Sequence, residues 1–325
     1  MEELEKEIFE ITNQKQFNKI CFKIFDFQKI NNPVYSKYCK IILGNKQPKS
    51  IYEIPFLPIS FFKTNEVIIK NTNVEKKFYS SGTSGNRSKH LISKLKLYEK
   101  SFNKSFEIFY GDIKKYCLIS MLPNYRERKD SSLIYMIDNL INYTNYPLSG
   151  AYKDNYKSVS DTLDILEKKK KETILIGVNN VLIDLAKNYP KTLKNTIIIE
   201  TGGNKIEDTK IIKEELHEIL KKSFNLENIH SEYGMTELLS QSYSKKNGIF
   251  QTPPWKKIII RDTEDPFTIV NNNKSGGVNI IDLANIYSCS FISTQDIGKK
   301  YDDDSFSVLG RFDNSELRGC NLLMQ

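Results

Sequence analysis

The stretch ETILIGVNNVLIDLAKNYPKTLKNTIIIETGG, residues 172–203, holds two short isoleucine-rich runs with a helical stretch between them. Each run, 172–178 and 195–200, is bounded by polar residues or glycine, as is typical of a buried strand. A helix is predicted next over 208–222, where Asp208 can cap the amino end and isoleucine and leucine recur on one face. This strand–helix alternation predicts a parallel sheet covered by helices.

The sequence on either side extends the pattern. Residues 116–122 are a further strand candidate, residues 1–30 have helical spacing, and two prolines within 54–63 predict an extended, buried segment. After Tyr233, short strand candidates follow one another without a long helix, at 255–261, 278–283, 287–294 and 305–309. We therefore predict an α/β core over residues 1–244, a small, mostly antiparallel β-rich subdomain over 245–310, and a short tail over 311–325.

The composition narrows the class of protein. Hydrophobic residues make up 39% and charged residues 27% of the 325 residues, which is typical of a globular protein. No apolar run approaches the roughly 20 residues that cross a bilayer, and the acidic start differs from a secretory signal. The net charge is +8, but the lysines are scattered apart from the run 168–171, which follows an apparent helix. We expect a cytoplasmic protein with no nucleic-acid partner and no transmembrane segment.

The cysteines and histidines do not form a metal or disulfide pattern. Five cysteines at irregular spacing contain no CxxC pair, and the three histidines are far apart. Four cysteines lie among apolar residues and are expected in the core: Cys21, Cys39, Cys117 and Cys289. Cys320 differs because it follows Gly319 and lies two residues after Arg318, where a nearby cation favours the reactive thiolate. The alternative for Cys320 is a small residue packed at the end of the chain.

The first chemical motif is Ser80-Ser81-Gly82-Thr83-Ser84-Gly85, with Arg87 and Lys89 close behind. Its glycines and hydroxyl groups cannot pack a core, but backbone N–H groups and hydroxyls of such a loop can surround a phosphate. The motif is not a Walker A loop, because GxxxxGK[ST] is absent. The motif alone fits a phosphate loop and a flexible surface loop equally well.

The second motif is Tyr233-Gly234-Met235-Thr236-Glu237, after a weak strand candidate at 226–230. A loop at the end of a strand is where open α/β sheets bind ligands. A nucleotide site could use the Tyr233 ring for stacking, Thr236 for a phosphate oxygen and Glu237 for Mg²⁺. Taken singly, the same residues are ordinary loop content.

Together, the two motifs resemble the adenylate-forming superfamily of acyl-CoA ligases and luciferase-like enzymes. Three further segments resemble that superfamily in the expected order: Thr201-Gly202-Gly203, Thr294-Gln295-Asp296-Ile297-Gly298 and Gly310-Arg311-Phe312-Asp313. Segments 54–63 and 310–323 narrow the resemblance to acyl-protein synthetases, best known from the bioluminescence fatty-acid reductase complex. The resemblance spans most of the chain.

The resemblance implies the core of an adenylate-forming enzyme, with parallel sheets, helices and a small β-rich subdomain but no large C-terminal lid. It implies that ATP and Mg²⁺ convert a fatty acid to acyl-AMP, and that the acyl group moves to a cysteine thiol and then to a reductase or another acceptor partner. The implied catalytic residues are Cys320 as acceptor, Thr236, and Glu237 as the Mg²⁺ ligand. The implied nucleotide-binding residues are Ser80, Ser81, Gly82, Thr83, Ser84, Gly85, Lys89, Gly202, Gly203, Tyr233, Gly234, Asp296 and Arg311.

Two other functions fit the same motifs. One is a ligase that passes the acyl group to coenzyme A or a carrier protein, and the other is a lidless scaffold that binds nucleotide. In the wider superfamily a lid of roughly a hundred residues supplies a lysine to the reacting phosphate. Only residues 312–325 follow Arg311, so that lysine has no counterpart here. We expect another lysine or a partner to supply the charge, or adenylation to be slow.

Overall fold

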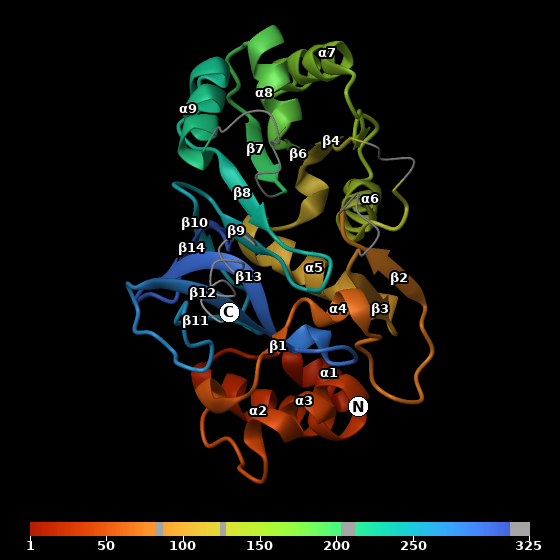
Figure 1. Cartoon of the computed structure of the whole chain (residues 1–325). Coiled ribbons are helices and arrows are strands. Elements are labelled where there is room, and N and C mark those ends of the chain that lie inside the picture. The colour runs from red at the N-terminus through yellow and green to blue at the C-terminus, as the bar shows by residue number, and fades with distance from the viewer. Residues whose placement is uncertain (82–86, 124–127, 203–211, 313–325) are drawn as a thin grey trace. The chain divides into compact units, whose positions relative to one another are not determined.

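The computed structural model describes residues 1–81, 87–123, 128–202 and 212–312 (Figure 1). The chain divides into two compact units. Unit 1 contains Met1–Thr72 and the residues from Pro254 onward, and unit 2 is Asn73–Pro253. Unit 2 is thus an insertion in unit 1 along the sequence. The predicted segments 1–244, 245–310 and 311–325 divide the chain differently, because residues near its start pack with strands near its end.

The sheet of unit 2 combines parallel and antiparallel neighbours in the order β5-β4-β6-β7-β8-β9-β10. Parallel pairing joins β5 (Gly150–Ala151), β4 (Cys117–Met121), β6 (Thr173–Val178), β7 (Thr196–Thr201) and β8 (His230–Tyr233). Antiparallel pairing adds β9 (Ser242–Ser244) and β10 (Ile249–Gln251). The predicted parallel α/β core is therefore confirmed, and β4, β6 and β7 begin and end within one residue of their predicted bounds.

The helices of unit 2 alternate with the parallel strands. They are α5 (Leu95–Tyr110), α6 (Ser132–Thr144), α7 (Tyr156–Lys168), α8 (Asn179–Asn188) and α9 (Lys213–Phe224), with the short η2 (Ile113–Lys115). Figure 1 shows α8 and α9 beside β6 and β7. The predicted cap Asp208 lies outside the described residues. At the other end α9 stops at Asn225, whose left-handed backbone with φ of 52° breaks the helix.

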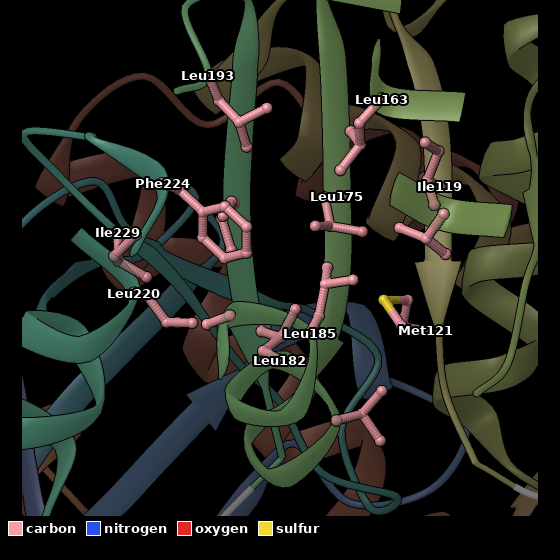
Figure 2. Close-up of a cluster of buried hydrophobic side chains, with 14 of the residues drawn as sticks. Ile119, Met121, Leu163, Leu175, Leu182, Leu185, Leu193, Leu220, Phe224 and Ile229 are labelled. Carbon is pink, nitrogen blue, oxygen red and sulfur yellow. The ribbon is translucent and has the colours of Figure 1, made fainter. Parts of the chain in front are cut away.

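One hydrophobic cluster joins α7, α8 and α9 to the sheet (Figure 2). Ile119 and Met121 of β4 and Leu175 of β6 point toward Leu182 of α8, while Phe224 of α9 closes the opposite side. All five side chains are fully buried. Replacing one such leucine by alanine typically costs about 2–5 kcal/mol, so this cluster fixes the helices against the sheet edges that carry the motifs.

Unit 1 contains an antiparallel sheet in the order β11-β12-β13-β14. Its strands are β11 (Lys256–Arg261), β12 (Ser275–Asp282), β13 (Phe291–Lys300) and β14 (Phe306–Arg311). The predicted antiparallel region is confirmed. The strand predicted over 287–294 begins later, at Phe291, because η3 (Leu283–Asn285) and a turn closed by Ser288 N–H on the Asn285 carbonyl occupy the preceding residues.

Helices fill the first part of unit 1. They are α1 (Glu2–Ile8), α2 (Gln14–Asn31), α3 (Pro33–Leu43), η1 (Ile51–Glu53) and α4 (Phe61–Thr64). The segment predicted to be extended over 54–63 holds β1 (Leu57–Pro58), parallel to β13. The prediction is wrong for its last residues, because both prolines precede α4 and nothing prevents a helical turn there. Within the described ranges, no helix is both long and apolar enough to cross a bilayer.

Buried contacts tie the N-terminal helices to the segment that runs from η3 to the start of β13. Gln28 of α2 donates to the carbonyl oxygens of Asn285 and Ile286, at 3.0 and 2.8 Å, and its own side-chain oxygen accepts from the Ser290 N–H at 3.0 Å. The Tyr35 ring of α3 stacks on the Phe291 ring, with centroids 5.8 Å apart. An unpaired buried polar group would destabilise the folded protein, so the Gln28 side chain is paired on all sides. Because its partners lie near the other end of the chain, unit 1 needs both ends of the chain to fold.

The four cysteines expected in the core are buried: Cys21, Cys39, Cys117 and Cys289. Burial raises the pKa of Cys39 to about 11. Burial likewise raises the pKa of Cys21 and of Cys289. These thiols are therefore poor nucleophiles at neutral pH. Cys320 lies outside the described residues.

Candidate nucleotide site

The carboxyl ends of β7 and β8 bring two of the sequence segments together in unit 2. Glu200 pairs with Ser231 in the parallel register, so Thr201 and Glu232 are adjacent. The Thr201 hydroxyl donates to Glu232 Oε2 at 2.5 Å. Thr201-Gly202 and Tyr233-Gly234 therefore leave the sheet side by side, at the edge where open α/β sheets bind ligands.

Gly234 packs closely against the side chain of Glu232 in the second motif. A Cβ atom on Gly234 would lie 2.5 Å from Glu232 Oε1, well inside van der Waals contact. The centroid of the Tyr233 ring lies 5.8 Å from the centroid of the Phe250 ring of β10. Glu237 is only 4% exposed. The turn that follows is closed by the Leu238 N–H on the Met235 carbonyl, at 3.1 Å. Thr236 and Glu237 carry a hydroxyl and a carboxylate on adjacent residues, and oxygen atoms of these kinds are the ligands that Mg²⁺ prefers.

A buried histidine connects the first motif to the second. His90 lies in β3 (Lys89–Ile92), directly after the first motif, and its Nδ1 is 2.7 Å from the Thr236 carbonyl oxygen. A carbonyl oxygen can only accept, so Nδ1 carries a proton in this bond. Sequence reasoning missed His90, although its place in the strand next to the motif was a usable signal.

The first motif connects the two strands of a hairpin. β2 (Lys76–Tyr79) pairs antiparallel with β3. The Ser80 N–H continues this ladder by donating to the Ser88 carbonyl at 3.1 Å, and the Ser88 N–H donates to Ser80 Oγ at 3.0 Å. Ser81 is exposed and Lys89 is partly exposed. Four predicted residues of this motif lie outside the described residues: Gly82, Thr83, Ser84 and Gly85.

A cluster of charged and titratable side chains around the buried Glu200 supports the end of β7 just before Thr201. Glu200 is 2% exposed and lies 2.7 Å from Lys213 Nζ and 3.7 Å from His217 Nε2. Burial favours a raised pKa for Glu200, but hydrogen bonding by His217 and the charge of Lys213 outweigh burial and hold the pKa below its ordinary value. Lys213 Nζ also lies 4.7 Å from the centre of the Phe250 ring, which contacts Tyr233. Glu200 and Lys213 were not found from the sequence.

Unit 1 brings together two other predicted residues, Asp296 and Arg311. They are register partners on β13 and β14, and Arg311 Nε donates to Asp296 Oδ1 at 2.8 Å. Asp296 is 4% exposed, and its own N–H donates to Thr294 Oγ1 at 3.1 Å. Arg261, also missed from the sequence, fixes this segment by donating from Nη2 to the Thr294 carbonyl at 2.7 Å. Gly203 lies outside the described residues.

Several solved structures have the same fold as this chain. The open form of 2-hydroxyisobutyryl-CoA ligase with 2-HIB-AMP and CoA has a TM-score of 0.64 at 12% identity, over 94% of this chain and 77% of that chain. ATP-bound MatB from Rhodopseudomonas palustris has a TM-score of 0.56 at 16% identity, over 73% of this chain and 48% of that chain. An ATP-bound RpMatB-BxBclM chimera gives 0.58 at 16% identity, over 75% and 49%. The chain thus spans about half the length of the MatB structures, and its fold is that of an adenylate-forming enzyme core.

The sequence then defines the family. The family described as acyl-protein synthetase, LuxE, matches residues 5–325. The chain therefore belongs to the LuxE acyl-protein synthetase family, as the resemblance of its motifs predicted. No curated protein sequence matches the chain.

Proposed function

We propose that the chain activates a carboxylic acid, of the fatty-acid class, as an acyl-adenylate and then transfers the acyl group to a thiol of its own. The observation that carries the proposal is the pairing of Thr201 with Glu232, which places the Thr-Gly and Tyr-Gly-Met-Thr-Glu segments at one sheet edge. Membership of the LuxE acyl-protein synthetase family supports it.

In the first step, a carboxylate oxygen of the acid bonds to the α-phosphorus of ATP. The bond from that phosphorus to the oxygen bridging to the β-phosphate breaks, and pyrophosphate leaves. The Tyr233 ring would stack on adenine, Asp296 would accept from the ribose hydroxyls, and the first motif would donate to the phosphates. Thr236 and Glu237 would hold Mg²⁺, whose charge offsets that of the phosphates.

In the second step, the Cys320 thiolate attacks the acyl carbon and AMP leaves, so a labile mixed anhydride becomes a longer-lived thioester. Cys320 is the candidate because the other four cysteines are buried, and burial disfavours the thiolate. A reductase or another acceptor would then take the acyl group. Coenzyme A or a carrier protein is the alternative acceptor, since the similar 2-hydroxyisobutyryl-CoA ligase was solved with CoA.

Intact-mass spectrometry after incubation with Mg-ATP and a panel of fatty acids tests this function. We expect an added acyl mass that requires ATP, is removed by hydroxylamine, and is lost in Cys320→Ser but kept in the matched control Cys21→Ala. Pyrophosphate release with one acid and no adduct would assign the acceptor to coenzyme A or a carrier. ATP binding without pyrophosphate release would instead indicate a nucleotide-binding scaffold.

A further inference from the structure

Lysines that are scattered in the sequence gather at one edge of the sheet in unit 2, the edge at which its parallel strands begin. This edge is formed by the last turns of α5 to α9 and the connections that follow them, which are residues 107–116, 141–149, 165–172, 185–195 and 221–229. The five segments contain eleven lysines, five acidic residues and no arginine. We call them the basic edge. It carries a surplus of six positive charges, in a chain whose net charge is +8.

The segments of the basic edge lie side by side. Lys171 joins three of them, because its Nζ donates to the Lys115 carbonyl oxygen at 2.6 Å and lies 4.7 Å from the centre of the Tyr146 ring. The strands β6 and β7 are paired, so the segment before β7 continues the row. The last segment is joined to it by the Leu193 N–H, which donates to the Phe224 carbonyl at 2.9 Å. Lysines far apart in the sequence therefore share one surface.

Most of the charge of the basic edge can meet a partner. Among the described residues, two of the eleven lysines form ion pairs, Lys191 with Asp164 and Lys221 with Glu218. The lysines of the run 168–170 are exposed. A cation near the carboxyl end of a helix interacts favourably with the helix dipole. This effect accounts for lysines in the last turns of helices, but not for those farther along the connections.

Large hydrophobic side chains are exposed on the same edge. Ile108, Tyr143 and Ile165 lie in the last turns of α5, α6 and α7, and they are 51%, 42% and 43% exposed. The described part of unit 2 has two other exposed large hydrophobic residues, Val74 and Ile212. Single exposed hydrophobic residues are ordinary, but three at one edge indicate a binding surface. Lysines around exposed apolar side chains are typical of a surface that lies in the interface of an anionic membrane.

We propose that the basic edge binds the surface of a membrane that contains anionic lipids. The lysines attract the lipid phosphates, and Ile108, Tyr143 and Ile165 enter the boundary between headgroups and acyl chains. Lysine ammonium groups act as separate point charges, which suit a fluid array of headgroups better than one defined anion. The candidate nucleotide site lies at the opposite ends of the same strands, so the two surfaces are separate. The inference goes beyond the proposed function and does not depend on it.

Co-sedimentation of the full chain with vesicles tests this surface. We expect binding to phosphatidylcholine vesicles that contain about one-third phosphatidylglycerol, and much weaker binding to phosphatidylcholine alone. Added salt should weaken the binding to the anionic vesicles. Lys168→Glu, at the last residue of α7, should weaken it about tenfold or more. Ile165→Gln should weaken it about threefold with the same dependence on salt, because it removes an apolar contact and no charge.

The matched controls lie at the other ends of helices in the same unit. Lys157→Glu makes the same charge change in the first turn of α7, and Ile212→Gln removes an exposed isoleucine directly before α9. Each should change vesicle binding by less than about twofold. Circular dichroism melts show which variants fold. Lys114→Glu repeats the charge test on another connection of the basic edge, with the same loss expected.

Two results would overturn the inference. One is the absence of binding to the anionic vesicles, or binding that Lys168→Glu and Lys157→Glu weaken equally. The other is binding to polyglutamate or duplex DNA as tight as to vesicles, with no effect of Ile165→Gln, which would assign the basic edge to an acidic macromolecule. Neither result bears on the proposed function, because Lys168→Glu should leave acid-dependent ATP–pyrophosphate exchange without vesicles unchanged.

Discussion

His90 holds Thr236 by a hydrogen bond from its ring to the backbone, with Nδ1 2.7 Å from the carbonyl oxygen. The ring is fully buried. This bond joins the strand that leaves the first motif to the turn that carries Glu237. A shift of the hairpin at one motif must therefore move the backbone of the other, although about 150 residues separate them.

Replacing His90 tests this link. Asparagine places an N–H donor where Nδ1 now lies, whereas leucine fills the space without a donor. We expect His90→Asn to keep most of the ATP–pyrophosphate exchange rate and His90→Leu to lower kcat about tenfold or more, with a smaller change in KM for the acid. Equal rates in the two variants, both folded by circular dichroism, would show that the bond does not position the turn.

Gly234→Ala tests the packing of the second motif. The new methyl group would force the Glu232 carboxylate aside. Glu232 is buried and accepts a hydrogen bond from Thr201, so this move would weaken both its packing and that hydrogen bond. We expect a loss of about 1–3 kcal/mol in the free energy of unfolding by urea, together with loss of exchange activity. Gly150→Ala is the matched control, since its Cβ would meet only Tyr152 Cε2 at 3.7 Å. Normal stability in Gly234→Ala would mean that Glu232 has room to move.

Asp296→Asn tests the proposed ribose contact in unit 1. The change removes the charge that pairs with Arg311 but keeps the size of the side chain. Arg311 is 63% exposed, so the ion pair should add less than about 1 kcal/mol to stability. We expect KM for ATP to rise about tenfold while the melting temperature stays nearly constant. Asp304→Asn, which breaks the pair with Lys300 in the same unit, should leave KM for ATP unchanged. A similar KM in both variants would refute the contact.

His230 should make stability depend on pH. Burial, and then the charges of Lys245 and His217, lower its pKa to about 4, below the ordinary value of 6.5. In the window between these values the unfolded chain binds the proton more readily, so His230 costs stability as pH falls from about 6.5 toward 4.

Urea unfolding near pH 7 and near pH 5 measures this cost. The free energy of unfolding should drop by about 1–2 kcal/mol more in the natural protein than in His230→Asn, which has no titrating ring but can still accept from the Tyr110 hydroxyl. Parallel pH curves for the two proteins would contradict the prediction.

The fold was largely predictable where buried strands are apolar throughout. β6 and β7 differ from their predicted bounds by one residue, because isoleucine runs mark them. β8 was predicted at 226–230 but spans His230–Tyr233. Its buried residues include Ser231 and Glu232, which carry polar side chains, so hydrophobicity gives no signal for it. The contact of α2 with η3 was equally hidden, because 257 residues separate Gln28 from Asn285.

The candidate site was predictable from the sequence only as motifs. Tyr233, Gly234 and Glu237 were found because glycine, hydroxyl and acidic residues gather in a loop. His90 and Glu200 were missed because their partners lie outside the local motif, as in the bond from His90 to Thr236. Such pairs have no local pattern, so only the folded chain identifies them.

The insertion of unit 2 into unit 1 has a consequence for synthesis on the ribosome. All of Asn73–Pro253 emerges as one continuous stretch and can fold while the rest is still being made. The first helices must wait, because Gln28 finds its carbonyl partners only when Asn285 and Ile286 appear. At about 5–20 residues per second, translation leaves α2 and α3 incomplete for roughly ten to fifty seconds. During that time their apolar faces are exposed, and chaperones have a defined segment to protect.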